Sequence, residues 1–184
     1  RVLLLSNSDR ELLNNDMMDY TPGAMRNAAR SAFRPINSMP MSLGTRCHQL
    51  AMYTLYEAPL QMLADNPTAY LQDSTCTRFI AAFPTVFDET VAIDGTVGEF
   101  AAIARRKGST WYIGALTDWT ARDLDIPLSF LGEGDYEAEV FSDGINAERD
   151  GTDYQRAILS VQQTSSIHLH MAKGGGWAAI IRKK

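Results

Sequence analysis

The stretch DLDIPLSF, residues 123–130, alternates polar with apolar residues, so that every second side chain from Leu124 to Phe130 is apolar. Successive side chains of a β-strand point to opposite faces, so this alternation predicts a strand with one buried and one solvated face. The stretch IHLHM, residues 167–171, shows the same alternation. Pro127 lacks a backbone N–H for a sheet ladder, which places the first of these strands at an edge.

Short strand-like segments separated by turn-forming stretches continue on both sides of these two, from Asp88 onward. Half-buried strands at this spacing are typical of an antiparallel β-sandwich. We therefore predict a β-sandwich over residues 88–184, with its boundary near Phe87. The expected strands are Glu99–Arg105, Thr110–Asp118, Asp123–Phe130, Tyr136–Ser142, Tyr154–Val161, Ser166–Met171 and Trp177–Arg182.

The part of the chain before this boundary is rich in strong helix formers. A helix is predicted over residues 43–65, with apolar residues on both sides, so other elements should cover it. Pro59 should kink or restart this helix, because proline removes a backbone donor and clashes with the preceding turn. A second helix is predicted over residues 74–83, capped by one of residues 73–75. One further strand is expected near residues 16–20.

The charge of the chain argues against binding to nucleic acid or to an anionic membrane. Its 184 residues carry a formal net charge of -5, and 45% of them are hydrophobic. Neutralising phosphates requires clustered Lys and Arg, whereas the basic runs here are residues 105–107 and 182–184. We interpret these two short runs as a solvated turn and a tail.

The two cysteines, Cys47 and Cys76, do not have the spacing of a metal site. The histidines are scattered and do not complete a zinc set with them; they are His48, His168 and His170. We therefore expect no metal site in this chain.

The chain begins with Arg1 and not with Met. Its first apolar run, residues 2–5, is too short for a signal peptide or a transmembrane helix. These two features lead us to expect a fragment or a processed product.

No catalytic motif stands out along the chain. No serine lies in a Gly-x-Ser-x-Gly context, and the Gly174–Gly176 run precedes a strand without the Lys and hydroxyl of a phosphate loop. Acid and base chemistry would need paired carboxylates, but spacing alone pairs none of them at the separation that glycoside hydrolysis requires. The distinctive carboxylates are Asp19, Glu57, Asp88 and Glu89.

Asp19 stands out because it follows the predicted strand and precedes Tyr20, Thr21 and a Pro-Gly turn. One interpretation is that its side chain caps this turn through a local hydrogen bond. The other is that it faces a ligand, because an α/β barrel presents residues at its active-site mouth from the ends of its strands. Both alternatives remain open at this point.

Much of the chain resembles a known family. MDYTPGAM (18–25), PMSLGTRCHQLAMYTLYEAPLQMLADNPTAY (40–70), residues 79–147 and HMAKGGGWAAII (170–181) are similar to the C-terminal part of glycoside hydrolase family 97. That family combines an N-terminal β-sandwich, a central (β/α)8 barrel with the active site and a C-terminal β-sandwich. The resemblance implies hydrolysis of terminal α-glucosidic or α-galactosidic bonds by a longer parent enzyme.

The resemblance divides the chain into three parts. Residues 1–17 form an unmatched leading segment, residues 18–87 would be the end of the catalytic barrel (its last strand and closing helices), and residues 88–184 would be the C-terminal sandwich. Asp19, Tyr20 and Thr21 would then lie at the rim of the sugar pocket. Two residues after this loop, Arg46 and His48, would support the rim or pack beneath it.

The resemblance places the catalytic machinery outside this chain. The glutamates that serve the family as general acid, general base and calcium ligands lie on earlier barrel strands, so we assign no catalytic residue here and expect the chain to be inactive alone. Ca²⁺ is implied for the parent and not for this chain. The implied location is the bacterial periplasm or the exterior, and the implied ligand is an α-linked oligosaccharide.

Two further predictions concern partners. Separated from its barrel, the helix predicted over residues 43–65 would expose an apolar side, which would bind the remainder of the parent or drive self-association. Alternatively, the sandwich is a non-enzymatic carbohydrate-binding module, or a purely structural one that stiffens the barrel. A binding module needs two or three coplanar exposed aromatic side chains, and the candidates are Trp111, Tyr112, Trp119, Tyr136 and Trp177.

Overall fold

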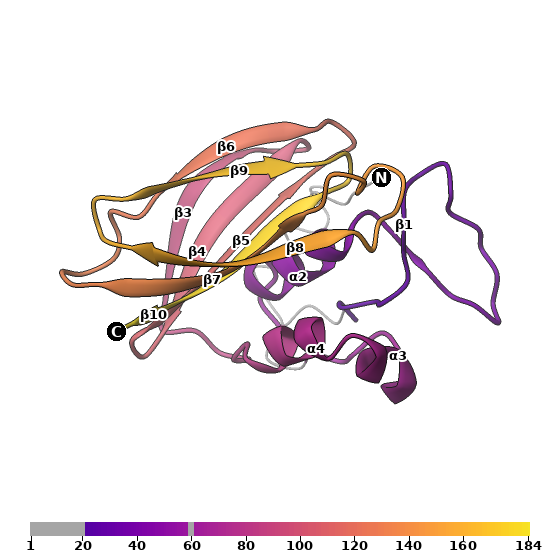
Figure 1. Ribbon diagram of the computed structural model, residues 1–184, viewed down its shortest axis with the longest axis horizontal. Helices are drawn as coiled ribbons and strands as arrows, with labels where there is room; N and C mark the ends of the chain where they lie inside the picture. Colours follow the sequence, from indigo (N-terminus) through magenta and orange to yellow (C-terminus); the bar gives the residue numbers. More distant parts are fainter. Residues whose placement is uncertain (1–20, 59–60) are drawn as a thin grey trace.

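A computed structural model describes residues 21–58 and 61–184. Its main feature is a six-stranded antiparallel sheet (Figure 1). The strands are β3 (Glu89–Thr96), β4 (Phe100–Lys107), β5 (Thr110–Thr117), β7 (Tyr136–Asp143), β8 (Tyr154–Val161) and β10 (Gly176–Lys183). Their order across the sheet is β3-β4-β5-β10-β7-β8, so the last strand of the chain lies in the interior of the sheet.

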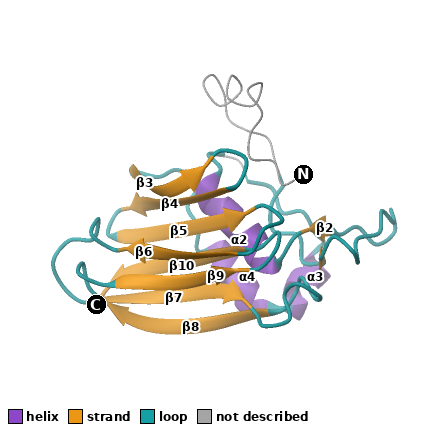
Figure 2. Ribbon diagram, turned by 90° about the horizontal axis from the view of Figure 1, so that it is seen from above, coloured by secondary structure: helices purple, strands orange, loops and turns teal. Residues whose placement is uncertain are grey.

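A two-stranded ladder covers one face of this sheet (Figure 2). It consists of β6 (Arg122–Pro127) and β9 (Ser166–Met171), paired so that Leu124 lies opposite Leu169 and Ile126 opposite Ile167. Apolar side chains fill the space between ladder and sheet, including those of Ile113, Val140, Met171, Trp177 and Ile181. Two antiparallel layers around one apolar core are the architecture of a β-sandwich.

Three helices lie on the opposite face of the six-stranded sheet (Figures 1 and 2). They are α2 (Arg46–Leu55), α3 (Pro67–Gln72) and α4 (Ser74–Ala81). α2 packs on β5 and β10, and Gly114 of β5 permits this approach, because a Cβ there would lie 2.7 Å from the Ala51 carbonyl oxygen. β10 is consequently buried on both faces, with Ala178 and Ile180 in the helical core.

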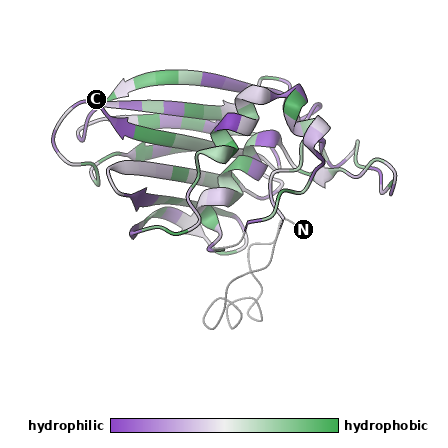
Figure 3. Ribbon diagram, turned by 90° about the horizontal axis from the view of Figure 1, so that it is seen from below, coloured by the Kyte–Doolittle hydropathy of each residue, from purple (hydrophilic) through white to green (hydrophobic). Residues whose placement is uncertain are grey.

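The two shortest strands, β1 (Asn27–Ala28) and β2 (Ser42–Leu43), pair in parallel next to the helices. The loop between them extends away from the rest of the molecule (Figure 1). Figure 3 shows hydrophobic residues along the main sheet, whose interior strands β5 and β10 are buried over most of their length. The region before the sandwich therefore consists of short elements attached to a regular sheet.

The predicted antiparallel sandwich is confirmed. The bounds of β8 and β9 agree with the prediction to the residue, and the remaining predicted strands differ from the structure by one to three residues at an end. β6 ends at Pro127 instead of continuing to Phe130. Within the described part of the chain β6 pairs with β9 alone, so the prediction that this strand lies at an edge is confirmed.

The long helix predicted over residues 43–65 is wrong in length. α2 ends at Leu55, because Tyr56 is extended, with φ of -90° and ψ of 137°. α4 confirms the second predicted helix, and Asp73 is its N-cap. Four elements were not predicted: the short strands β1 and β2, the edge strand β3, and α3, although Asn66 caps α3 and proline follows at its first position. The strand expected at residues 16–20 lies outside the described residues.

The part of this predicted helix that forms α2 does not expose an apolar side, whereas Leu43, Met62 and Leu63 of the predicted range are exposed outside α2. Eight of the ten residues of α2 are buried, among them polar ones, and its two remaining residues, Met52 and Leu55, are half-buried. The sheet covers α2 on one side, and residues 22–27 with α4 contribute to its surroundings on another. Self-association through α2 therefore has no exposed surface to use.

Candidate functional site

The predicted pocket rim lies at the start of the described chain. Asp19 and Tyr20 are outside the described residues, whereas Thr21 is described and exposed. Whether these three residues line a sugar pocket therefore stays a prediction. The described segment that follows Thr21 begins with two buried residues, Pro22 and Gly23.

Side chains from the helical region hold the backbone of residues 22–23. The Gly23 N–H donates to Oε1 of Gln49 at 3.1 Å, and the Tyr70 hydroxyl donates to the Gly23 carbonyl oxygen at 3.0 Å. The Tyr53 hydroxyl donates to the Pro22 carbonyl oxygen at 3.2 Å. Gly23 has a φ of 82°, a conformation that favours glycine, and a Cβ there would collide with the Tyr53 ring.

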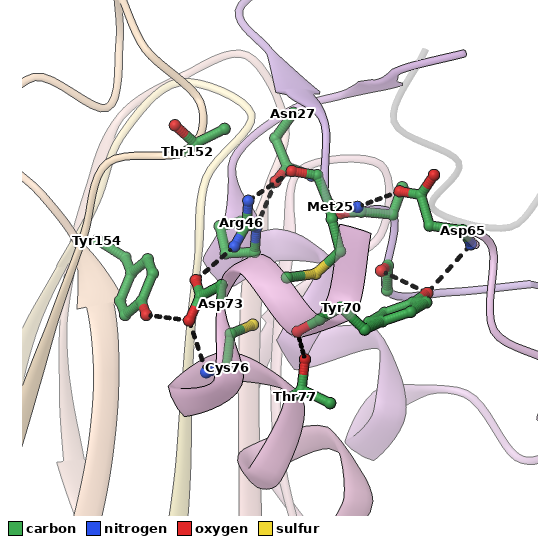
Figure 4. A network of polar contacts seen from close by, with 12 residues as sticks. Met25, Asn27, Arg46, Asp65, Tyr70, Asp73, Cys76, Thr77, Thr152 and Tyr154 are labelled. Atoms are coloured by element: carbon green, nitrogen blue, oxygen red, sulfur yellow. Dashed lines mark hydrogen bonds and ion pairs between the residues drawn. The ribbon is translucent and has the colours of Figure 1, made fainter. Parts of the chain in front are cut away.

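Arg46 holds the next part of the same segment (Figure 4). Its side chain is buried, and its Nε and Nη2 donate to Oδ1 of Asn27 and to the Met25 carbonyl oxygen, both at 2.5 Å. Nη1 donates to Oδ2 of Asp73 at 2.8 Å. A planar guanidinium with several donors in fixed directions can join three partners in this way, which a lysine cannot do.

Asp73 connects this arginine to the sandwich. Its Oδ1 accepts a hydrogen bond from the Cys76 N–H at 3.0 Å, which caps α4, and another from the Tyr154 hydroxyl of β8 at 2.9 Å. The Arg46 guanidinium also lies 6.0 Å from the centre of the Tyr154 ring. Burial and then the Asp73 carboxylate raise the pKa of Tyr154, so this hydroxyl remains a donor at neutral pH.

A pocket of about 230 Å³ opens beside this network. Two pairs of its lining groups are engaged with one another: the Met25 N–H donates to Oδ2 of Asp65 at 2.6 Å, and Arg46 binds Asp73. The lining residues are Met25, Arg26, Ser38, Met39, Pro40, Arg46, Asp65, Asn66, Ala69, Gln72 and Asp73. The pocket brings together no nucleophile and base, so it supports an anchoring role and not catalysis.

The structure separates the two residues expected beneath the rim. Arg46 contacts the rim-proximal segment, as described above. His48 is buried elsewhere, with its Nδ1 3.0 Å from the Gly175 carbonyl oxygen of the β9–β10 turn. Burial lowers the pKa of His48, so the ring is neutral at pH 7. His48 therefore packs beneath the sandwich.

The other carboxylates singled out in the sequence have structural contacts. Asp88 binds Lys107 and the Gly108 N–H, each at 2.8 Å, and these hydrogen bonds lower its pKa. Glu89 binds Arg106 at 2.9 Å, and Glu57 is exposed. The structure brings no two of these carboxylates together as a catalytic pair.

Sequence analysis missed a buried carboxylate, Asp143, at the end of β7. Its Oδ2 accepts hydrogen bonds from the N–H groups of Ala172 and Gly176 at 2.9 and 3.0 Å. Burial raises its pKa to about 6, and hydrogen bonds, including those from Thr45 and Cys47 at the start of α2, offset only part of that rise. Asp143 thus joins the first turn of α2 to the β9–β10 turn.

The described residues contain neither a metal-binding cluster nor a membrane-spanning helix. Among residues 21–58 and 61–184, no three His, Cys, Asp or Glu side chains are grouped as a metal ion would require. The ladder carries two exposed cross-strand pairs of one histidine and one carboxylate each, His168–Asp125 at 3.0 Å and His170–Asp123 at 2.8 Å. In the same residues no helix is both long and apolar enough to cross a membrane.

The aromatic side chains do not form the platform that a carbohydrate-binding module needs. Trp111, Tyr112, Tyr136 and Trp177 are all buried, with exposed fractions of 7% or less. Trp119 is half-buried and lies against Gly174. These five candidates therefore pack within the fold and do not provide the coplanar exposed aromatic side chains that a carbohydrate-binding module needs.

Comparison with known proteins gives one family. Residues 86–182 match domains described as "Glycosyl-hydrolase 97 C-terminal, oligomerisation". A "Retaining alpha-galactosidase" from Bacteroides thetaiotaomicron is 48% identical over 165 residues, which are 90% of this chain and 25% of that protein. A "Probable retaining alpha-galactosidase" from Streptomyces bingchenggensis is 29% identical over 163 residues, 89% of this chain and 23% of that protein.

Solved structures agree with the sequence relatives. A glycoside hydrolase family 97 enzyme in complex with acarbose, from Pseudoalteromonas sp. strain K8, has a TM-score of 0.81 and 34% identity, covering 92% of this chain and 27% of its own. A β-arabinopyranosidase has a TM-score of 0.64 and 28% identity, covering 74% of this chain and 21% of its own. The chain thus spans about a quarter of the length of the curated relatives it matches.

Proposed function

Because this chain belongs to glycoside hydrolase family 97, we propose that it serves as the C-terminal part of a retaining α-galactosidase. The observation that carries the proposal is the 48% identity with the Bacteroides thetaiotaomicron enzyme, which extends over 90% of this chain. The match begins before the sandwich, so the helical region belongs to the same similarity. The activity itself is proposed for the longer protein.

We also propose that residues 18–87 are the end of a (β/α)8 barrel and residues 88–184 a separate C-terminal sandwich. The likeness to the Pseudoalteromonas structure supports this division, because it covers 92% of the chain. A barrel active site draws residues from the ends of several strands, and the whole barrel takes about 250 residues. This chain would accordingly supply the rim at Asp19, Tyr20 and Thr21, and it would be inactive alone.

The proposed chemistry uses two carboxylates on the earlier barrel strands. In a retaining enzyme one carboxylate attacks the anomeric carbon while a second carboxylic acid protonates the leaving oxygen, and water then releases the sugar. Asp88, Glu89 and Glu57, within the described part of the chain, form no such pair. Its residues would orient the sugar at the rim and stabilise the barrel end.

Calcium does not fit the residues described here, because no three carboxylate, histidine or cysteine side chains are grouped. We therefore assign no step to calcium in this chain and propose it only for the remainder of the longer protein. A periplasmic or secreted location is likewise a proposal, supported by the family resemblance alone. Fractionation of cells that produce the longer protein would test it.

A specific observation favours a second candidate activity on α-glucosides. Relatives from Pseudoalteromonas sp. strain K8 were solved with acarbose and with panose, at 34% and 33% identity to this chain. Both are α-linked oligosaccharides. The higher identity to the α-galactosidase makes α-galactosides the first choice of substrate.

Hydrolysis of p-nitrophenyl α-galactoside and α-glucoside tests both candidates. The assay compares this chain with the longer protein that contains it, each with and without added Ca²⁺. We expect activity in the longer protein, greater on the galactoside, and none in this chain. Hydrolysis by this chain alone would show that its own carboxylates form a site, and the assignment of chemistry to earlier strands would be wrong.

Self-association remains a proposal as well. The family description names oligomerisation, which supports a contact through the sandwich. α2 is buried and does not provide such a surface. Sedimentation of the longer protein would determine whether it forms an oligomer.

A further inference from the structure

One polar connection runs from the sandwich to the segment that follows the predicted rim (Figure 4). It starts at Tyr154 on β8, passes through Asp73 and ends with Arg46 bound to Met25 and Asn27. Each step is a direct hydrogen bond of 2.9 Å or less. Residues more than a hundred positions apart in the chain are thereby held in one arrangement.

The acceptor in the middle explains why the connection is rigid. Asp73 uses Oδ2 for Arg46 and Oδ1 for both Tyr154 and the Cys76 N–H, so neither oxygen can move without breaking a bond. Hydrogen bonds to a charged group are stronger than those between neutral groups. The backbone N–H of Arg46 adds a second link to the sandwich by donating to the Gly151 carbonyl oxygen at 2.6 Å.

We propose that Arg46 and Tyr154 are positioning residues for sugar binding: through them, the sandwich fixes residues 22–27 and so Thr21, the described residue of the predicted rim. This inference rests on the proposed function. It gives the sandwich a role in substrate binding without any sugar contact of its own. Neither residue touches the reacting atoms.

The expected kinetic consequence follows from where the rim acts. A rim that holds the sugar contributes equally to binding of the substrate and of the transition state, and losing such uniform binding raises KM and leaves kcat unchanged. Disorder at the rim would have to be overcome each time a sugar binds, which weakens binding without altering the chemical step. A change of KM with constant kcat is therefore the signature of this role.

The first test uses the longer protein with Tyr154→Phe, which removes the hydroxyl and keeps the ring. We expect KM for p-nitrophenyl α-galactoside to rise about fivefold, the loss of one ordinary hydrogen bond, with kcat within about twofold of wild type. The matched control is Tyr136→Phe, because Tyr136 and Tyr154 lie at opposite ends of the β7–β8 hairpin. This control should have the wild-type KM.

Arg46→Lys extends the test without removing the charge. A lysine can still pair with Asp73, but it cannot reach Met25 and Asn27 with a planar fork. We expect KM to rise about tenfold, again with little change in kcat. A fall in kcat at constant KM in either variant would overturn the positioning role, and so would a KM equal to that of Tyr136→Phe.

Hydrogen exchange provides a readout that does not depend on activity. The Gly23 and Met25 N–H groups are bonded to Gln49 and Asp65, so they report how firmly the segment is held. In Tyr154→Phe these amides should exchange several-fold faster than in Tyr136→Phe. Equal exchange in the two variants would overturn this inference alone, whereas a wild-type protein that hydrolyses neither glycoside would overturn the proposed function and the sugar-binding role with it.

Discussion

The two faces of the six-stranded sheet are buried by different means. On the ladder side the core is built from apolar side chains, with the buried Thr117 hydroxyl, which accepts from Arg122 of β6, at its margin. On the helical side, α2 buries the polar residues Arg46, His48, Gln49 and Thr54 together with its apolar ones. The same strands therefore pack against mainly apolar side chains on one face and against hydrogen-bonded polar side chains on the other.

This difference has a physical meaning. Apolar burial is roughly proportional to area and has no preferred direction, so it stabilises the sandwich without specifying exact partners. Buried polar groups must find partners in fixed directions, because each unpaired one costs about 1–3 kcal/mol. The helical face consequently sets the position of residues 22–27, whereas the ladder face mainly contributes stability.

The largest effect should come from the ladder face. Trp177→Ala removes a large side chain that is 1% exposed, and we expect the free energy of unfolding to fall by about 4 kcal/mol. Denaturant titration would measure it, with Val97→Ala, at a position 75% exposed, as the control that changes little. A loss below about 1.5 kcal/mol would mean that this face is not the main source of stability.

Arg46→Met should have the next largest effect, on the helical face. It keeps most of the side-chain volume but leaves Asp73, Met25 and Asn27 without their common donor, so we expect a loss of about 3 kcal/mol. The control is Arg106→Met, which removes an exposed pair with Glu89 and should cost less than about 1 kcal/mol. Equal losses in the two variants would contradict the distinction drawn between buried and exposed polar contacts.

Asp143→Asn should change how stability depends on pH. The folded state raises the pKa of this carboxyl from 3.8 to about 6, so it binds the proton more tightly than the unfolded state does. Its contribution is therefore fully present below pH 4 and is lost as pH rises through 6, by roughly 3 kcal/mol in all.

The asparagine variant lacks this titration. Relative to the variant, the wild-type protein should lose stability between pH 4 and pH 7, as measured by denaturant titration at a series of pH values. A difference between the two proteins that stays constant over this range would show that Asp143 does not titrate as we expect. Asp153→Asn is a suitable control, because Asp153 lies nearby in the chain and its carboxylate accepts an exposed hydrogen bond from the Asn146 N–H at 2.8 Å.

Thr54→Val should have the smallest effect and the opposite sign. The Thr54 hydroxyl is buried on α2 and has no hydrogen-bond partner among the described residues. Replacing it with a methyl group of similar shape should stabilise the protein by up to about 1 kcal/mol. Thr117→Val is the matched control, because the Thr117 hydroxyl donates to the Thr120 carbonyl oxygen at 2.9 Å. Loss of this hydrogen bond should lower the free energy of unfolding.

The sandwich could be predicted well because its signal is local. In β9 polar and apolar residues alternate within the strand, and turn-forming residues flank both β8 and β9. The predicted bounds of both strands agreed with the structure. β3 was missed because it is a mostly exposed edge strand whose alternation reduces to Val91 and Ile93. Local pattern thus succeeded at one edge of the sheet, β8, and failed at the other, β3.

The helical face could be predicted only in part, because its contacts join distant segments. The composition of residues 43–65 favours a helix throughout, yet α2 stops at Leu55, before the proline whose ring disfavours a helical residue ahead of it. The partners of Arg46 lie 19 to 27 residues away. No spacing rule in the sequence indicates such a fork, and the same holds for the burial of Asp143 by a turn 29 residues later.

The position of β10 within the sheet bears on how the protein is made. β10 pairs with both β5 and β7 and is synthesised after them. Until β10 emerges from the ribosome, the edges of β5 and β7 that it pairs with stay unpaired. Unpaired edges are templates for association with other chains, and growing chains that expose them are prone to aggregate. Completion of this sheet is therefore possible only once β10 has left the ribosome, and chaperones that shield nascent β-strands should increase the yield of the protein.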